Sequence, residues 1–288
     1  MNLIDIASWQ AGMDLAVMFA KNPDLDGVIV KLTQGAGYTN PCADAWISWL
    51  RANGKPFGTF HYLDGSGAVA EARHYADLLA KYPGGVPALD YEAEALRLGT
   101  GYVKAALDEV LRLTGVRPLV YCSQVSALEA QDFTAIAAAG YGLWVAQYAD
   151  YSPVRGFLTD PWHAGKPSPF TAYTMRQYTS MGYLPGWGSR LDFDLFYGTA
   201  EDWAALAAGG VSPAPALKGP DPQVIADVLS GEYGTGLDRF AALTAAGYDA
   251  EAVQKKVNEL YAIALSCKPY MDGNLEYANS ILKIVRLL

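Results

Sequence analysis

The chain has 288 residues, about half of them apolar, and carries a formal net charge of −9 with an isoelectric point near 4.8. This length accommodates one large domain and one small one, and the chain can bury a sizeable core. The acidic balance leaves no basic surface that could neutralise phosphates, so we expect no nucleic-acid partner.

Cysteines and the amino-terminal residues limit the other classes. Cys42, Cys122 and Cys267 are far apart and form no metal or redox motif, so we expect free, packed thiols, no metal site and no cofactor. The start MNLIDIASWQ lacks the basic and apolar segments of a secretion signal, and no run of eighteen apolar residues occurs. We therefore expect synthesis in the cytoplasm without an export signal, and no membrane anchor.

Strands and helices are predicted to alternate through the first 208 residues. Strands are expected at 2–6, 27–35, 55–63, 86–92, 117–123, 143–148, 173–180 and 189–196, and helices at 13–21, 42–53, 68–81, 100–114 and 199–208. A long segment rich in Pro and Gly separates the sixth and seventh strands and is expected to form a wall of a cleft. Eight strands, with helices between the first five, predict a parallel barrel with short later connections.

The last third of the chain has a different pattern. Residues 209–222 combine Gly, Pro, Ala and Ser and predict a semi-rigid linker. Only helices are expected beyond it, at 222–232, 236–248, 249–265 and 272–287. We therefore predict three parts: a barrel over residues 1–208, a linker over 209–222, and a small all-α helical bundle over 223–288.

The segment VPALDYEAE, at 86–94, carries the clearest chemical signal. Side chains alternate along a strand, so Asp90 and Glu92 project from the same face, about 7 Å apart along the backbone. Partial burial of two neighbouring carboxyls raises the pKa of at least one, which lets an enzyme keep one acid protonated beside a charged one. The alternative is a pair of solvated acids at a strand end, which the nearby Glu94 favours.

With these strands in place, the chain resembles glycoside hydrolase family 25, the muramidases. The motifs IDIASWQ, VIVKLTQG, LDYE, YCS, LWVAQY, RQYTS and LDFDLF occur in the family's order and cover about residues 1–208. The resemblance implies an irregular TIM-like (β/α) barrel. It also implies hydrolysis of the β-1,4 bond between N-acetylmuramic acid and N-acetylglucosamine in bacterial peptidoglycan.

The same resemblance assigns roles to the acids. Glu92 matches the general acid, and Asp90 matches the partner that stays ionised. Asp90 either supports the reaction directly, by charge or as a nucleophile, or orients the substrate's own 2-acetamido group for attack on the anomeric carbon. Asp5 and Asp192 match two further acids that hold and tune this pair, with a capping role as the alternative for Asp5. Asp194 stands where the family has Asn and adds a negative charge near the site.

Sugar rings bind against aromatic faces, with polar side chains on their hydroxyls. The candidates near predicted strand ends are Tyr62, Tyr121, Trp144, Gln147, Gln177 and Tyr178, each of which is equally compatible with core packing. Phe60 stands where the family often has Tyr. His61 alternates away from Phe60 and Tyr62, so we expect it to pack against helices rather than act as a base.

Residues 229–260 resemble the CW_7 cell-wall-binding repeat, a three-helix module. The candidates for wall contact are Tyr233, which replaces the family's usual Trp, together with Asp238 and Arg239; solvated helix charges are the alternative reading. A hydrolase followed by a wall binder indicates a phage endolysin that leaves the cytoplasm through a membrane lesion made by another protein.

Three alternatives remain open at this level: a wall-binding protein with an inert barrel, a hydrolase of chitin, and a structural part of a virion. The sequence does not define the oligomeric state, and a monomer is compatible with it.

Overall fold

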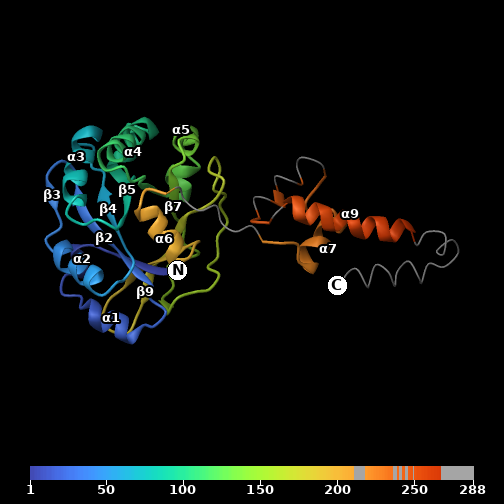
Figure 1. Cartoon of the computed structure of the whole chain (residues 1–288), viewed down its shortest axis with the longest axis horizontal. Helices are drawn as coiled ribbons and strands as arrows, with labels where there is room; N and C mark the ends of the chain where they lie inside the picture. Colours follow the sequence, from blue (N-terminus) through green and yellow to red (C-terminus); the bar gives the residue numbers. More distant parts are fainter. Residues whose placement is uncertain (211–217, 236–238, 240–241, 244–245, 249, 267–288) are drawn as a thin grey trace. The chain divides into compact units, whose positions relative to one another are not determined.

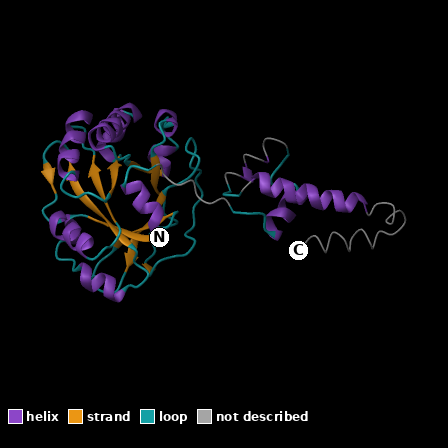
Figure 2. Ribbon diagram, viewed as in Figure 1, coloured by secondary structure: helices purple, strands orange, loops and turns teal. Residues whose placement is uncertain are grey.

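The computed structural model describes residues 1–210, 218–235, 239, 242–243, 246–248 and 250–266. The chain divides into two compact units, Met1–Ala214 and Pro215–Leu288. Figures 1 and 2 show strands and helices in the first unit and helices in the second. The predicted helix at 272–287 and residues 211–217 of the predicted linker lie outside the described residues.

Eight strands of the first unit form a closed barrel in the order β1-β10-β9-β7-β6-β5-β4-β2, with β2 pairing back to β1. The barrel strands are β1 (Asn2–Ile6), β2 (Gly27–Gln34), β4 (Phe57–Tyr62), β5 (Val86–Asp90), β6 (Leu119–Ser123), β7 (Gly142–Ala146), β9 (Met175–Tyr183) and β10 (Leu191–Phe196). Two short strands, β3 (Tyr38–Thr39) and β8 (Val154–Arg155), pair with β2 and β9. The predicted irregular (β/α) barrel is confirmed.

Helices surround this barrel, as Figure 2 shows. They are α1 (Leu15–Lys21), α2 (Ala43–Ala52), α3 (Ala68–Leu79), α4 (Thr100–Thr114), α5 (Thr134–Ala138) and α6 (Ala200–Ala207). Asp14 caps α1 by accepting hydrogen bonds from the amides of Ala16 and Val17, and Gly115 ends α4 in the left-handed conformation that glycine adopts without strain.

One strand reverses the expected direction. β10 runs antiparallel to both β9 and β1, so the prediction of a wholly parallel barrel is wrong at this strand. Residues 184–190 join β9 to β10, and a connection this short cannot make the crossover that parallel neighbours require. The beginning of β10 therefore lies at the end of the barrel where the parallel strands finish.

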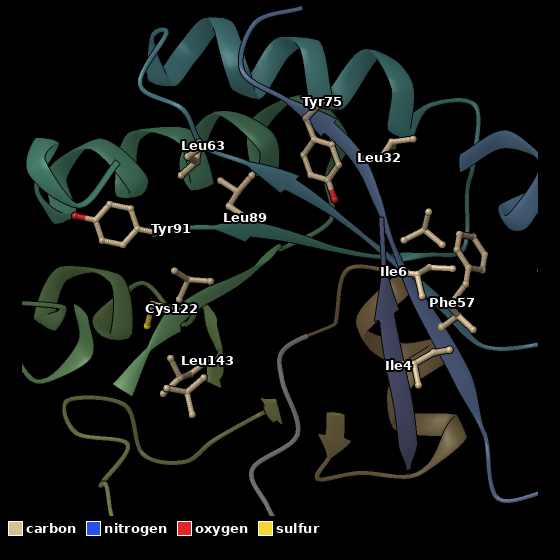
Figure 3. Packing of buried hydrophobic residues seen from close by; sticks show 14 of the residues in the cluster. Ile4, Ile6, Leu32, Phe57, Leu63, Tyr75, Leu89, Tyr91, Cys122 and Leu143 are labelled. Carbon is tan, nitrogen blue, oxygen red and sulfur yellow. The ribbon is translucent and has the colours of Figure 1, made fainter. Parts of the chain in front are cut away.

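Alternation along the strands separates two apolar layers. The barrel interior holds Leu3, Ile29, Ala88, Leu119, Trp144 and Met175, together with Trp203 and Leu206 of α6. The outer layer lies between strands and helices, and Figure 3 shows Leu89, Tyr91 and Tyr75 within it. Because Leu89 and Tyr91 face outward, Asp90 between them faces the interior.

The second unit is helical in its described part. It contains α7 (Pro222–Ser230) and α9 (Ala250–Ser266). Asp221 caps α7 through a 2.9 Å hydrogen bond from the amide of Val224, and Pro222 occupies the first turn, where a missing N–H costs nothing. A separate core is formed by Val224, Ile225, Val228, Leu243, Ala250, Val253 and Val257.

Two sequence predictions concern membrane-spanning helices and the cysteine thiols. Within the described residues, no helix combines the length and apolar character that a membrane span requires. Cys42 and Cys122 are free thiols, whereas Cys267 lies outside the described part of the chain.

Candidate active site

Four carboxyl groups from three strands meet at one mouth of the barrel. Asp5 lies near the end of β1, and Asp192, near the beginning of the reversed β10, is its direct partner across the sheet. Asp90 is the last residue of β5, and Glu92 follows two residues later. All four line one cleft of about 340 Å³. The structure therefore brings together the acids that the sequence singled out.

The local structure after β5 positions Glu92. Its backbone is extended, with φ −146° and ψ −176°, and a 3-10 helix begins at the next residue, Ala93, and runs to Leu98. Ala93 has a φ of +44°, in the left-handed region that costs any residue with a Cβ atom. The chain thus turns sharply directly after Glu92, whose side chain lies at the mouth of the barrel.

Burial raises the pKa of the acids on β1 and β10. The pKa of Asp5 rises to about 6, although a 2.6 Å hydrogen bond from Gln177 Nε2 to its Oδ2 opposes the rise. The pKa of Asp192 rises to about 8, first through burial and then through the negative charge of Asp5. Both carboxyls therefore hold protons far more readily than solvated ones.

Asp90 and Glu92 also have pKa values raised by burial, with Lys31 opposing the rise in each case. The charge of Glu92 adds to the rise at Asp90, whose Oδ1 is buried without a hydrogen-bond partner. The sequence predicts that Asp90 stays ionised beside a protonated Glu92. In the free site, however, burial disfavours the charge on both residues, so the pair titrates as a unit.

Asp194 does not add the negative charge near the site that the sequence predicts. It is fully buried, and its Oδ1 accepts a 2.8 Å hydrogen bond from Trp144 Nε1, while Oδ2 has no partner. Burial, followed by the charges of Asp5 and Asp192, raises its pKa well above the usual range. The neutral acid is therefore the favoured form.

Gln177 connects the acids to the aromatic wall. Its amide nitrogen donates to Asp5, and its Oε1 accepts hydrogen bonds from the hydroxyls of Tyr121, at 2.9 Å, and Tyr148. Because both hydroxyls donate to the oxygen, the amide has one orientation, with its N–H groups directed at Asp5. This network fixes the carboxylate of Asp5 within the cleft.

Four of the six predicted sugar-binding residues line the cleft: Tyr62, Tyr121, Trp144 and Gln177. Tyr178 does not. Its neighbour Gln177 faces inward, so Tyr178 faces the outer layer, where it is buried against Phe193 and its hydroxyl accepts a hydrogen bond from the amide of Leu158. The prediction that Tyr178 lines the cleft is wrong.

The prediction that Gln147 lines the cleft is also wrong. Gln147 lies just after β7, out of phase with Trp144 and Tyr148 of the cleft, and its Oε1 accepts hydrogen bonds from the amides of Ala164 and Gly165 at 3.1 and 3.2 Å. These bonds hold the long segment between β7 and β9. Tyr148, the next residue, lines the cleft instead.

Sequence reasoning missed four cleft residues: Ala7, Trp9, Lys31 and Tyr148. Lys31 could have been found by extending the alternation of Ile29 along β2. Its Nζ donates to Gln34 at 2.7 Å and lies 4.6 Å from the centre of the Tyr62 ring. Trp9 is 90 % exposed, which no sequence pattern indicates.

His61 packs outside the barrel, as predicted. It is fully buried between Thr33 Oγ1, at 2.7 Å from Nδ1, and Glu71 Oε2, at 3.1 Å from Nε2. Phe60 lines the cleft without offering a hydroxyl. Among the described residues, no group of His, Cys, Asp and Glu side chains is arranged to hold a metal ion.

The candidate wall-contact residues occupy different settings. Tyr233 packs against the core of the second unit. Arg239 donates from Nε and Nη2 to the carbonyl of Gly234 and from Nη1 to Gln254, so its guanidinium supports the module itself. Asp238 lies outside the described residues.

Sequence comparison agrees with this architecture. Residues 4–187 match Glycosyl hydrolases family 25, and residues 222–261 match the CW_7 repeat. The chain belongs to glycosyl hydrolases family 25. It is accordingly a glycoside hydrolase acting on peptidoglycan, with a cell-wall-binding repeat after the barrel.

Individual relatives fit the same assignment. A lysozyme of Streptococcus phage Cp-7 is 26 % identical over 268 residues, which are 89 % of this chain and 69 % of the relative. A bacterial lysozyme from Streptomyces coelicolor superposes with a TM-score of 0.58 at 20 % identity, covering 72 % of this chain and 96 % of the other. A muramidase from Acremonium alcalophilum gives 0.55 at 21 % identity, covering 73 % and 99 %. Both structural likenesses concern the barrel fold.

Proposed function

We propose that the barrel is a muramidase that cleaves the β-1,4 bond between N-acetylmuramic acid and N-acetylglucosamine, with Glu92 as the general acid. The observation that carries this proposal is the meeting of Asp5, Asp90, Glu92 and Asp192 in one cleft with aromatic walls. An acid with a raised pKa is suited to donate a proton, and the aromatic faces suit sugar rings.

In the proposed reaction, Glu92 protonates the glycosidic oxygen as the bond to the anomeric carbon breaks. The acetamido oxygen of the muramoyl sugar attacks that carbon, and Asp90 holds the acetamido N–H and stabilises its developing positive charge. Water then adds to the anomeric carbon, gives its proton to Glu92 and restores the acetamido group. The positive charge on the substrate favours ionised Asp90, which the free site disfavours.

The raised pKa values of Asp5 and Asp192 support their role around this pair. Asp5 is held by Gln177, so its position is fixed relative to the mouth. Partly neutral neighbours limit the repulsion that ionised Asp90 has to overcome. We therefore assign Asp5 and Asp192 to positioning and charge tuning rather than to bond making.

Muropeptide analysis tests the reaction. Purified protein is incubated with peptidoglycan, new reducing ends are converted to alcohols with borohydride, and the products are identified by mass spectrometry. We expect reduced N-acetylmuramic acid at the new ends, and we expect a loss of at least about a hundredfold in rate for Glu92→Gln. New ends of N-acetylglucosamine, or full activity of Glu92→Gln, would contradict the proposal.

We also propose that the whole chain is an endolysin, made in a host cytoplasm and acting on the wall after release. The order of hydrolase and wall-binding repeat, and the extent of the match to a phage lysozyme, support this role. Expression in a bacterium whose wall is susceptible tests it: lysis should follow only when a membrane-permeabilising protein is also expressed. Lysis without that protein would contradict the release step.

A further inference from the structure

A second hollow of about 710 Å³ adjoins the acid cleft. We call it the Arg190 pocket; its walls include Trp9, Tyr151, Ser180, Trp187, Arg190 and Asp192. Trp9 and Asp192 line both this pocket and the cleft. The ring of Tyr151 also packs edge-on against Tyr148 of the cleft, with ring centres 6.1 Å apart. The two hollows are therefore continuous at the rim of the barrel.

The Arg190 pocket exposes large aromatic side chains. Trp9 and Tyr151 are 90 % and 73 % exposed. Large aromatics exposed together at one hollow are typical of binding surfaces rather than of a solvated exterior. The lining also includes the hydroxyl-bearing side chains of Tyr151 and Ser180, so the pocket combines apolar faces with hydrogen-bonding groups.

Arg190 supplies a positive charge to this pocket. It forms none of the ion pairs found among the described residues, and its Nη1 lies 4.0 Å from Sδ of Met181. Lys31, by contrast, faces Asp90 and Glu92 and is bonded to Gln34 on the other side of the cleft. The charge of Arg190 also acts on Asp192, and Arg190 is the one cation among the described residues that line this pocket, so it is the group that can receive an anionic ligand there.

We infer that the Arg190 pocket binds a carboxylate of the peptide stem carried by the muramoyl sugar. This inference rests on the proposed muramidase function, since that reaction places a muramoyl sugar at the acids and obliges its stem to leave the cleft nearby. The N-acetylated sugars of the glycan are neutral, whereas the stem carries free carboxylates. A guanidinium offers a planar fork that matches a carboxylate, and Trp9 and Tyr151 cover the apolar parts of the peptide.

A matched pair of substrates tests the inference. Soluble glycan strands bearing stems with free carboxylates are compared with the same strands after carbodiimide coupling to ammonia, which converts the carboxylates to amides of equal size. We expect the unmodified protein to prefer the carboxylate form in kcat/KM by about tenfold, mainly through KM, as for one charge-assisted hydrogen bond. Raising the salt concentration should reduce this preference.

Variants separate the pocket from general effects. Arg190→Gln should bring the ratio of the two kcat/KM values close to one, and Arg190→Lys should keep part of it. Arg51→Gln, an exposed arginine on α2, removes the same charge elsewhere and should keep the full ratio. The ratio is the readout because Arg190 also lowers the pKa of Asp192, so its removal can change hydrolysis of both substrates together.

The ratio of the two kcat/KM values tests the inference, and the released ends test the proposed function. A ratio near one in the unmodified protein, or an unchanged ratio in Arg190→Gln, overturns the inference. An equal loss of both activities in Arg190→Gln also overturns it, because that result indicates a sugar subsite or an effect on Asp192 alone. If the unmodified protein releases no muramic acid ends from either substrate, the proposed function itself has failed.

Discussion

Asp194 lies one step further into the barrel than the acids of the cleft, since it pairs with Leu3 whereas Asp192 pairs with Asp5. The titratable groups whose charges interact with it are Asp5, Asp192, Tyr148 and Tyr178, and its uncharged polar neighbours are Trp144, which donates to it, and Gln177, its partner across the sheet. No basic group is among these neighbours. A neutral carboxylic acid is the form that this setting favours.

The pH dependence of stability follows from this raised pKa. Below the ordinary pKa of Asp, the folded and unfolded states are both protonated and the favourable contribution of Asp194 is complete. Between that pH and its raised folded-state pKa, the unfolded state loses the proton while the folded state keeps it, so the free energy of unfolding falls by about 1.4 kcal/mol per pH unit. We expect Asp194→Asn to remove this slope, because an amide resembles the neutral acid in shape and does not ionise.

Urea denaturation of the barrel at several pH values between 4 and 8 measures the slope. The variant and the unmodified protein should have similar stability near pH 4, and the variant should gain with each pH unit above it. The exposed Asp160, changed to Asn, is the control for loss of one carboxyl. Identical slopes for Asp194→Asn and the unmodified protein would show that Asp194 is charged in the folded state.

The joint between β5 and the 3-10 helix that follows it carries backbone strain. Ala93 holds a φ of +44° directly after Glu92. Glycine adopts this conformation without the Cβ penalty, so we expect Ala93→Gly to raise the free energy of unfolding by about 1 kcal/mol. Thermal denaturation checks the direction and size of the change.

A glycine at an ordinary helical position gives the opposite control. Ala105 is exposed within α4, and Ala105→Gly should lower the free energy of unfolding by about 1 kcal/mol. If both glycine variants are destabilised alike, Ala93 is not strained. Hydrolysis by Ala93→Gly, measured in the same preparation, reports whether the constraint on the backbone also serves to aim Glu92.

The alternation of side chains along a strand predicts which residues face the barrel interior. The limits of this pattern also explain the wrong predictions. Alternation identifies inward-facing Asp90, and it also excludes Tyr178 once Gln177 is known to face inward. It could not predict the direction of β10, because a strand pattern reads the same both ways and only the short connection before it reveals the hairpin. The reversal matters for the site, since it carries Asp192 to the same mouth as the ends of β1 and β5.

The exposure of a side chain and the pKa of a buried acid could not be predicted from the sequence, because both depend on the assembled barrel. The side chain of Trp9 is exposed and that of Trp144 is buried, although both are tryptophans near strand ends. Likewise, the sequence marks Asp194 as a departure from the family pattern, but only its burial beside Trp144 reveals that its charge is suppressed. Exposure and pKa are set by neighbours from distant parts of the chain.

The two units have independent apolar cores. The two barrel clusters contain described residues no later than Leu206, and the core of the second unit begins at Val224. A chain ending at Ala214 should therefore fold and should hydrolyse soluble glycan strands at the rate of the full protein. Its action on intact walls should weaken, since the wall-binding repeat raises the local concentration of the barrel at its substrate.

Comparison of the two chains on both substrates tests this division of labour. We expect the shortened chain to need about a hundredfold more protein for half-maximal binding to purified walls, a loss of the size that linked binding sites provide. Equal loss on walls and on soluble strands would mean that the second unit supports the barrel rather than the encounter with the wall. Because soluble strands require no attachment to a surface, their hydrolysis isolates the barrel, and the difference between the two substrates measures the contribution of the repeat.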